Sequence, residues 1–169
     1  DQQATFTQQD GSSITRDYDF IHVVPPMSAP DAVRNSDLIA KEGKFTGNWL
    51  DVDIYTLQHN RYPEVFGIGD VIGAPLNKTA ASVKAQAPIV TENLLAAMQG
   101  KPLPRKHNGY TSCPLITSIG KAMLVEFGYD LEFLPSFPFI DPKEESWVTW
   151  TFKDKMLQPA YYAVLEGQA

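Results

Sequence analysis

Cys113 is the one cysteine of the sequence and lies in its most specific short string, Gly109-Tyr110-Thr111-Ser112-Cys113-Pro114-Leu115. A deprotonated thiol is a nucleophile, and the neighbouring Thr111 and Ser112 hydroxyls are donors that would steady it. Pro114 favours an extended backbone at Cys113. The alternative is an inert cysteine that only fills space in the packing. Because the sequence has one cysteine, no disulfide can form within the chain.

A second chemical feature is the carboxylate of Asp70, which ends the apolar run Val65-Phe66-Gly67-Ile68-Gly69-Asp70. We expect this run to be a short strand, and ligands of α/β sheets bind at the carboxyl ends of strands. A carboxylate only accepts hydrogen bonds, so its natural partner is a ligand hydroxyl, such as one on a sugar alcohol. Gly69 leaves no side chain beside this carboxylate to block a close approach. Gly-Asp pairs are also common in turns, which is the alternative interpretation.

A helix is predicted to follow, from about Lys78 to Gln99, with Asn77 as its N-cap. Its first N–H groups, near Lys78 and Thr79, would point their positive dipole end at the ligand and stabilise a ring that becomes negative on reduction. Pro88 is expected to kink or split the helix. Gly100 and then Pro102 would end it. One apolar face is predicted, made of Val83, Ala87, Val90, Leu94 and Met98.

The remaining elements must hold these two features in place. Turn residues, β-branched runs and prolines predict where they begin and end. We expect a hairpin about Asp10-Gly11, with strands at Thr5–Thr7 and from Ser13; a buried strand over Tyr18–Val24; a short helix starting near Pro30-Asp31; a strand over Asp51–Gln58; a linker over Arg105–Gly109; a hairpin of Lys121–Phe127 with Leu131–Leu134; and helical segments over Ser146–Glu166 that break at Pro159.

Composition excludes several classes of function. The 169 residues are 43% hydrophobic and 20% charged, as in a folded soluble protein. A net charge of -6 gives no basic surface, so no nucleic-acid partner is expected. No two of His22, His59 and His107 have the spacing of metal ligands, so no metal is assigned, and each histidine is expected to be structural or at the surface rather than a proton relay. The sequence has no apolar run of the roughly 20 residues that a spanning helix needs.

Aromatic residues gather toward the C-terminus, where ten of the 19 lie between Phe127 and Tyr162. Aromatic rings next to Lys143, Lys153 and Lys155 are typical of a surface that lies at a membrane–water interface. An aromatic core or a dimer interface would explain the same composition.

Several short strings together resemble one family of flavoproteins. The run Pro63-x-Val65-Phe66-Gly67-x-Gly69-Asp70, followed by Lys78-Thr79-Ala80-Ala81, resembles the second FAD-binding motif of the two-dinucleotide-binding-domain (pyridine nucleotide-disulfide oxidoreductase) superfamily. With Tyr18-Asp19-x-x-His22-Val23-x-Pro25-Pro26-Met27, the Cys113 string and Glu126-Phe127-x-Tyr129, the pattern resembles sulfide:quinone oxidoreductase. The fingerprint Gly-x-Gly-x-x-Gly is absent, so we expect the C-terminal part of a longer protein.

The resemblance implies a fold and a set of ligands. The fold would be α/β in the whole protein and α+β in this piece. Residues 1–55 would end a second nucleotide-binding domain, 56–104 would hold the last strand and helix of the FAD domain, and 105–169 would form a quinone and membrane-interface domain. Asp70 would bind the ribityl chain of FAD, while Gly67, Gly69 and the backbone near Lys78 and Thr79 would contact the cofactor.

The resemblance also implies a reaction. Cys113 would be one of two redox cysteines, its partner lying in the missing N-terminal half. Sulfide would be oxidised to persulfide or polysulfide, a thiol or sulfite would accept the sulfur, and electrons would pass through FAD to a quinone. The protein would lie peripherally on a bacterial cytoplasmic membrane or the mitochondrial inner membrane, and this piece alone would be inactive.

Two other interpretations stay open. A type II NADH:quinone oxidoreductase has the same fold and needs no cysteine at position 113; a flavocytochrome-type sulfide dehydrogenase fits the C-terminal tail less well. A folded piece that acts only in assembly or dimerisation is the interpretation without catalysis. In that case exposed apolar surface would pair two copies into a homodimer.

Overall fold

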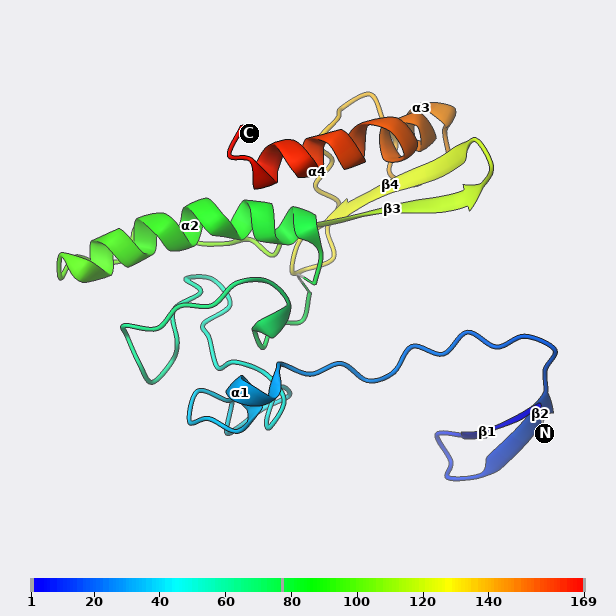
Figure 1. Ribbon diagram of the computed structural model, residues 1–169, viewed down its shortest axis with the longest axis horizontal. Helices are drawn as coiled ribbons and strands as arrows, with labels where there is room; N and C mark the ends of the chain where they lie inside the picture. Colours follow the sequence, from blue (N-terminus) through cyan, green and yellow to red (C-terminus); the bar gives the residue numbers. More distant parts are fainter. Residues whose placement is uncertain (1, 77, 169) are drawn as a thin grey trace.

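The computed structural model describes residues 2–76 and 78–168, and Figure 1 labels its helices and strands. Its described residues form two separate two-stranded antiparallel sheets and a few helices. The α+β expectation for this chain is therefore confirmed.

The first hairpin pairs β1 (Gln3–Thr7) with β2 (Ser13–Asp17). Its turn contains Gly11 in the left-handed region, at φ 83°. The Asp10 carboxylate accepts a hydrogen bond from the Ser12 backbone N–H at 2.9 Å, which closes the turn locally. The predicted hairpin is confirmed.

The segment after β2 is an extended arm, defined here as residues 18–28, which Figure 1 shows as a line leading from the hairpin to α1 (Asp31–Arg34). The buried strand predicted over Tyr18–Val24 is wrong for this chain. Phe20 is 87% exposed and Val24 71% exposed. Tyr18 still continues the hairpin by donating its N–H to the Gln2 carbonyl at 3.0 Å. No described strand lies beside residues 19–28, so the apolar side chains there stay in solvent.

The core lies in the middle of the chain, with little regular structure around it. Its buried members are Leu50, Val52, Leu57, Ile72, Ala74 and Ile89. The predicted strands over Asp51–Gln58 and Val65–Asp70 are wrong, because each is reduced to isolated bridges. The Asp53 carboxylate accepts from the Thr56 N–H at 2.6 Å and turns the chain. The positive φ of Gly69 starts a short 3₁₀ helix, η1 (Gly69–Val71).

Helix α2 (Ala80–Met98) is capped by Thr79, whose hydroxyl accepts from the Ser82 N–H. Asn77, the predicted cap, lies outside the described residues. The helix continues through Pro88 and is not split. Its end is as predicted, with Gly100 in the left-handed region at φ 65°, the conformation that commonly follows a helix.

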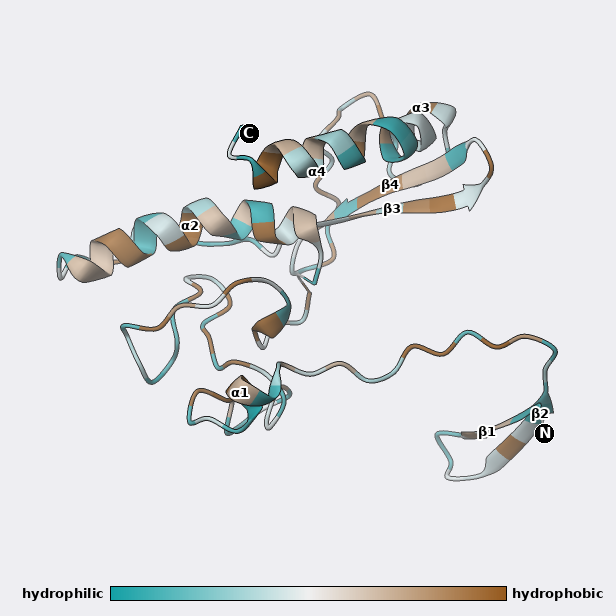
Figure 2. Ribbon diagram, in the orientation of Figure 1, coloured by the Kyte–Doolittle hydropathy of each residue, from teal (hydrophilic) through white to brown (hydrophobic). Residues whose placement is uncertain are grey.

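The buried face of α2 differs from the predicted apolar face. Ser82, Gln86, Ile89 and Asn93 are buried, whereas the predicted Met98 is 76% exposed. Gln86 and Asn93 face inward because their side chains form hydrogen bonds with the backbone of neighbouring loops. Asn93 Nδ2 donates to the carbonyls of Thr56 at 2.9 Å and Arg105 at 3.0 Å. Figure 2 colours hydrophobic residues brown along the same helix.

The second hairpin pairs β3 (Thr111–Ser118) with β4 (Lys121–Phe127). The predicted pairing of Lys121–Phe127 with Leu131–Leu134 is wrong except for one bridge, between Phe127 and Phe133, because β4 takes β3 as its partner. β3 thus runs directly through Cys113 and Pro114.

Helices cover one face of this hairpin. α3 (Trp147–Thr151) packs on β4, and a π-helical turn, η2 (Phe152–Met156), leads into α4 (Leu157–Leu165), as Figure 1 shows. The helical prediction for this region is confirmed, but the predicted break at Pro159 is wrong. Pro159 lies in the helix directly after the π-helical turn, and the helical backbone continues through it.

Candidate functional site

Cys113 lies on β3 with its side chain exposed. The buried residues of β4, among them Leu124 and Glu126, alternate along the strand on the face that α3 covers. Their partners on β3 are Pro114 and Ser112, so Cys113 belongs to the opposite, open face. An open position gives a sulfur nucleophile access to small reactants.

Glu126 forms a buried polar cluster directly across from Ser112. This carboxylate is 3% exposed and accepts hydrogen bonds from the Tyr110 hydroxyl, the Ser136 N–H at 2.8 Å and the Ser136 hydroxyl at 2.6 Å. Burial, followed by the bond to Glu126, raises the pKa of Tyr110. Glu126 was noted in the sequence as part of a motif, but its buried polar role was not predicted. An acidic residue between the apolar positions of a strand could have indicated it.

The two glycines before Asp70 have packing reasons of their own. A Cβ at Gly67 would lie 2.3 Å from Leu50 and 2.9 Å from Ile72, so the core requires a residue without a side chain there. Gly69 has φ 71° and donates its N–H to Gln86 Oε1 at 2.7 Å. Asp70 itself is exposed on η1. The site therefore presents the Asp70 carboxylate on a short turn that is fixed to α2 by the Gly69–Gln86 hydrogen bond.

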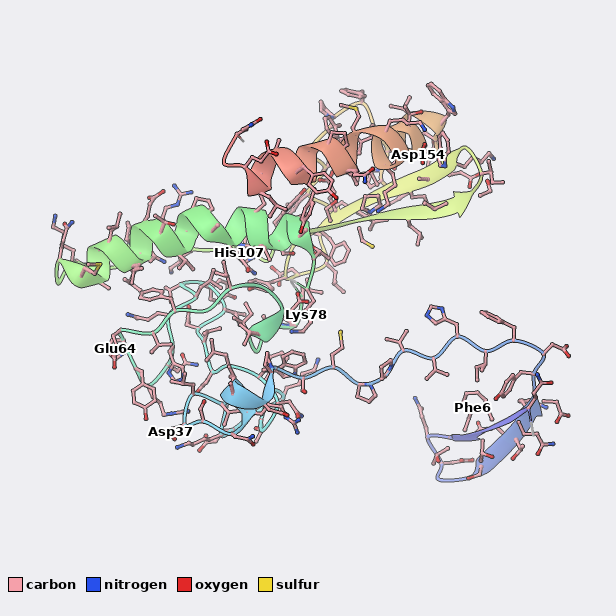
Figure 3. The ribbon with its side chains drawn as sticks, in the orientation of Figure 1. Phe6, Asp37, Glu64, Lys78, His107 and Asp154 are labelled. Carbon is pink, nitrogen blue, oxygen red and sulfur yellow. The ribbon has the colours of Figure 1, made fainter. Side chains whose placement is uncertain are left out.

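Lys78 points its side chain back onto its own chain (Figure 3). Its Nζ donates to the carbonyl of Asp70 at 2.6 Å and to that of Ile72 at 3.3 Å. The same Nζ lies 3.4 Å from the centroid of the Trp49 ring, a cation–π contact. Burial lowers the pKa of Lys78, and the charge of Asp70 opposes part of that effect. Lys78 thus fastens η1 next to the N-terminus of α2.

Thr79 connects the two predicted sites. Its hydroxyl lies 3.1 Å from the Thr111 hydroxyl, so β3 begins beside the N-terminus of α2, as Figure 1 shows. Thr111 stands two residues before Cys113. The structure thereby brings the cysteine strand to the helix end that follows Asp70, whereas Gly67 lies in the core.

The buried histidine His59 has a structural role. Its Nδ1 accepts from the N–H groups of Arg61 and Tyr62, and its Nε2 donates to the carbonyl of Leu38. His107 is buried as well, and this burial lowers its pKa. Within residues 2–76 and 78–168, no three His, Cys, Asp or Glu side chains cluster as metal ligands would.

Comparison with known proteins gives three related sequences of one kind, although no family model matches the chain. The chain is 40% identical over 148 residues to the mitochondrial sulfide:quinone oxidoreductase of Mus musculus, covering 88% of this chain and 32% of the relative. For the protein of the same name in Dictyostelium discoideum the identity is 40%, over 98% of this chain and 36% of the relative. For the protein of the same name in Schizosaccharomyces pombe the identity is 44%, over 76% of this chain and 27% of the relative.

The fold of this chain also occurs among solved structures. A chain in the cryo-EM structure of the Tetrahymena thermophila mitochondrial ATP synthase superposes with a TM-score of 0.80 over 99% of this chain and 40% of its own length. The sequence identity is 23%, so the likeness concerns the fold alone.

These relatives define the class of protein first: the chain is similar to part of larger oxidoreductases. More particularly, it is homologous to the C-terminal part of the sulfide:quinone oxidoreductases, which confirms the resemblance stated from the motifs. The chain spans about a third of the length of the curated relatives it matches.

Proposed function

We propose that this chain is the C-terminal part of an FAD-dependent enzyme that oxidises sulfide to sulfane sulfur and passes the electrons to a membrane quinone. The names of the three relatives support the substrates. The observation that carries the proposal is the position of Cys113: its thiol is exposed on a strand whose first residue is bonded to the N-cap of α2. A cysteine that only filled space would be buried.

The residues around η1 fit the cofactor that the proposal needs. Asp70 offers an exposed carboxylate, which accepts from hydroxyls such as those of a ribityl chain. The N-terminus of α2, beginning at Thr79 and Ala80, favours negative charge on a nearby ring. Bound FAD would supply a two-electron acceptor. Gly69 and the backbone of Lys78 would complete this cradle, and Gly67 would support it from the core.

Cys113 supplies the sulfur chemistry in this proposal. Hydrosulfide attacks a disulfide between Cys113 and a second cysteine, so a new S–S bond forms as the old one breaks. One cysteine then carries a persulfide and the other leaves as a thiolate. Since this chain has one cysteine, the second belongs to another part of the enzyme. A thiol or sulfite removes the outer sulfur, and re-forming the disulfide releases two electrons toward the quinone.

The test uses the intact protein, meaning this chain together with the N-terminal part that its relatives have. Under anaerobic conditions, sulfide should bleach the flavin absorbance of the wild type, and Cys113→Ser should abolish both the bleaching and quinone reduction. Ser118→Ala, at the far end of β3, is the matched control and should behave as the wild type.

Three outcomes would contradict the proposal. Normal sulfide turnover by Cys113→Ser would remove the role of the thiol. Bleaching by NADH and not by sulfide would instead indicate a type II NADH:quinone oxidoreductase. Self-association of the protein without any bound flavin would favour a role in assembly or dimerisation.

The C-terminal helix supports a membrane-surface location. Tyr161, Tyr162 and Leu165 of α4 are 52%, 54% and 64% exposed, so aromatic and apolar side chains face outward together. Among the described residues, no helix combines the length and the apolar character that crossing a bilayer requires. Because amphipathic rings prefer the interface, the exposed Tyr161 and Tyr162 support a position of α4 on the surface of a quinone-containing membrane.

Co-sedimentation with lipid vesicles tests this placement. Changing both Tyr161 and Tyr162 to Ser should weaken binding of the intact protein, whereas Phe6→Ser, which removes a similarly exposed aromatic from the N-terminal hairpin, should not. Equal binding of all three proteins would show that α4 does not contact the membrane.

A further inference from the structure

Three hydroxyl groups meet where α2 and β3 begin. The Thr79 hydroxyl lies 2.9 Å from that of Ser82 and 3.1 Å from that of Thr111. Ser82 is fully buried and Thr111 is 4% exposed. A bond between such groups is shielded from water, so breaking it leaves a polar group without its partner.

The helix side of this contact is fixed independently of β3. Thr79 also accepts a capping bond from the Ser82 N–H at 3.2 Å, a contact that does not involve Thr111. One turn further along α2, Gln86 accepts from Gly69 and so locks the helix to η1. The Thr111 hydroxyl is thus a separate attachment that joins β3 to an already anchored helix end.

On the strand side of this contact, β3 links Thr111 to the Cys113 thiol. Residues two apart on a strand lie on the same face, about 7 Å from each other. Thr111 and Cys113 therefore share the face of β3 opposite the one that α3 covers, with Thr111 buried beside α2 and Cys113 exposed. Pro114 stiffens the strand immediately beyond. A displacement of Thr111 from Thr79 would move the sulfur with it.

We infer that the Thr79–Thr111 hydroxyl pair is a positioning joint, which sets where the Cys113 sulfur stands relative to the N-terminal end of α2. This inference rests on the proposed function, in which that helix end faces the cofactor and the sulfur reacts beside it. Thr111 is a positioning residue and does not touch the reacting atoms. A misplacement of about 1 Å can cost on the order of 100-fold in rate, so a joint of this kind has a measurable effect.

A spin-label distance measurement tests the joint without any catalytic assay. Thr91→Cys places a second label on the exposed side of α2, and Cys113 carries the first. Thr111→Val, which keeps the shape and removes the hydroxyl, should broaden or shift the distance distribution between the two labels. Thr111→Ser, which keeps the hydroxyl, should restore it, and Thr117→Val, on the same strand, should leave it unchanged. Thr111→Ala, a second variant without the hydroxyl, should act in the same direction, and all distances are compared at a temperature at which melting curves show every variant folded.

Kinetics of the intact protein complete the test. Thr111→Val should lower kcat for sulfide-dependent quinone reduction by about tenfold or more, with little change in KM, and Thr111→Ser should recover most of it. Unchanged distances and unchanged kcat in Thr111→Val and Thr111→Ala would overturn the joint. If instead the wild type does not respond to sulfide, the proposed function fails and the label distances alone decide the joint.

Discussion

Glu126 is a carboxylate held in the interior by hydrogen bonds from neutral groups, those of Tyr110 and Ser136. Several bonds to one buried carboxylate offset the loss of water around it. Because Glu126 stands opposite Ser112, the cluster fixes the strand next to Cys113 from the face that α3 covers, while Thr111 fixes it from the other face through its bond to Thr79. At the scale of single residues, the cysteine position is held by hydroxyl groups.

The Tyr110 hydroxyl should contribute stability that depends on pH. Because Tyr110→Phe removes the bond to Glu126, the free energy of unfolding at neutral pH should fall by about 2 kcal/mol. The folded-state pKa of Tyr110 is raised above its ordinary value of 10.0, so this contribution is complete below that value and declines as pH rises further. Urea unfolding at neutral and alkaline pH should show the gap between the two proteins closing above pH 10.

Tyr161→Phe is the control for that experiment, since Tyr161 is half exposed on α4. Its stability should follow that of the wild type at every pH. A gap between wild type and Tyr110→Phe that widened above pH 10 would contradict the raised pKa.

At the scale of elements, η1 depends on α2 through Gln86. Gln86→Ala would leave the buried Gly69 N–H without its acceptor. It would also open a cavity, so the free energy of unfolding should fall by about 3 kcal/mol. Hydrogen exchange should speed up at Gly69 before it does so in the rest of the chain. The control is Lys84→Ala, which changes an exposed residue of the same helix. Its stability should differ from that of the wild type by less than about 0.5 kcal/mol.

Pro88 makes the second prediction for α2. It lies exposed inside the helix and lacks the N–H that would donate to the carbonyl of Lys84. Pro88→Ala should therefore raise the melting temperature, with a gain of up to about 3 kcal/mol. Circular dichroism of the thermal transition measures it, and Pro102→Ala, beyond the end of the helix, should give no comparable gain.

Elements that depend on neighbouring residues could mostly be predicted from the sequence, whereas a strand that needs a distant pairing partner could not. The Asp10-Gly11 hairpin, α1 and the end of α2 at Gly100 follow from residues within a few positions of each other. The strand at Tyr18–Val24 depends on distant segments. The partner of β4 is a local one, since β3 ends at Ser118, opposite Lys121, but Pro114 hid β3 because proline weakens a strand pattern. The buried face of α2 was missed since Gln86 and Asn93 bond to remote backbone.

The candidate site divides in the same way. Cys113, Asp70 and the start of the helix were identified from short motifs. The Thr79–Thr111 bond joins positions 32 residues apart, and nothing in the local pattern of either residue indicates the other. The packing role of Gly67 against Leu50 was equally out of reach.

At the scale of the whole molecule, the arm over residues 18–28 should be the first part of this chain to be cut by a protease. Its backbone is extended and most of its side chains are exposed, with Phe20 at 87%. Brief chymotrypsin treatment followed by mass spectrometry should find cleavage after Phe20 before cleavage after Phe66 in the core region.

In the intact protein the same arm should resist the enzyme, because its β-branched and aromatic pattern is that of a strand within a sheet. Equal cleavage rates in the chain and in the intact protein would show that the arm has no partner there either.

In α2 polar side chains face inward and apolar ones face solvent, and this arrangement affects expression of the chain in a host cell. Gln86 and Asn93 bond inward, whereas Leu95 and Met98 are left 52% and 76% exposed. An apolar strip of this kind on a newly synthesised polypeptide is a surface that molecular chaperones retain and that promotes aggregation. Yield in a host cell should therefore follow the supply of folding helpers more closely than the rate of translation.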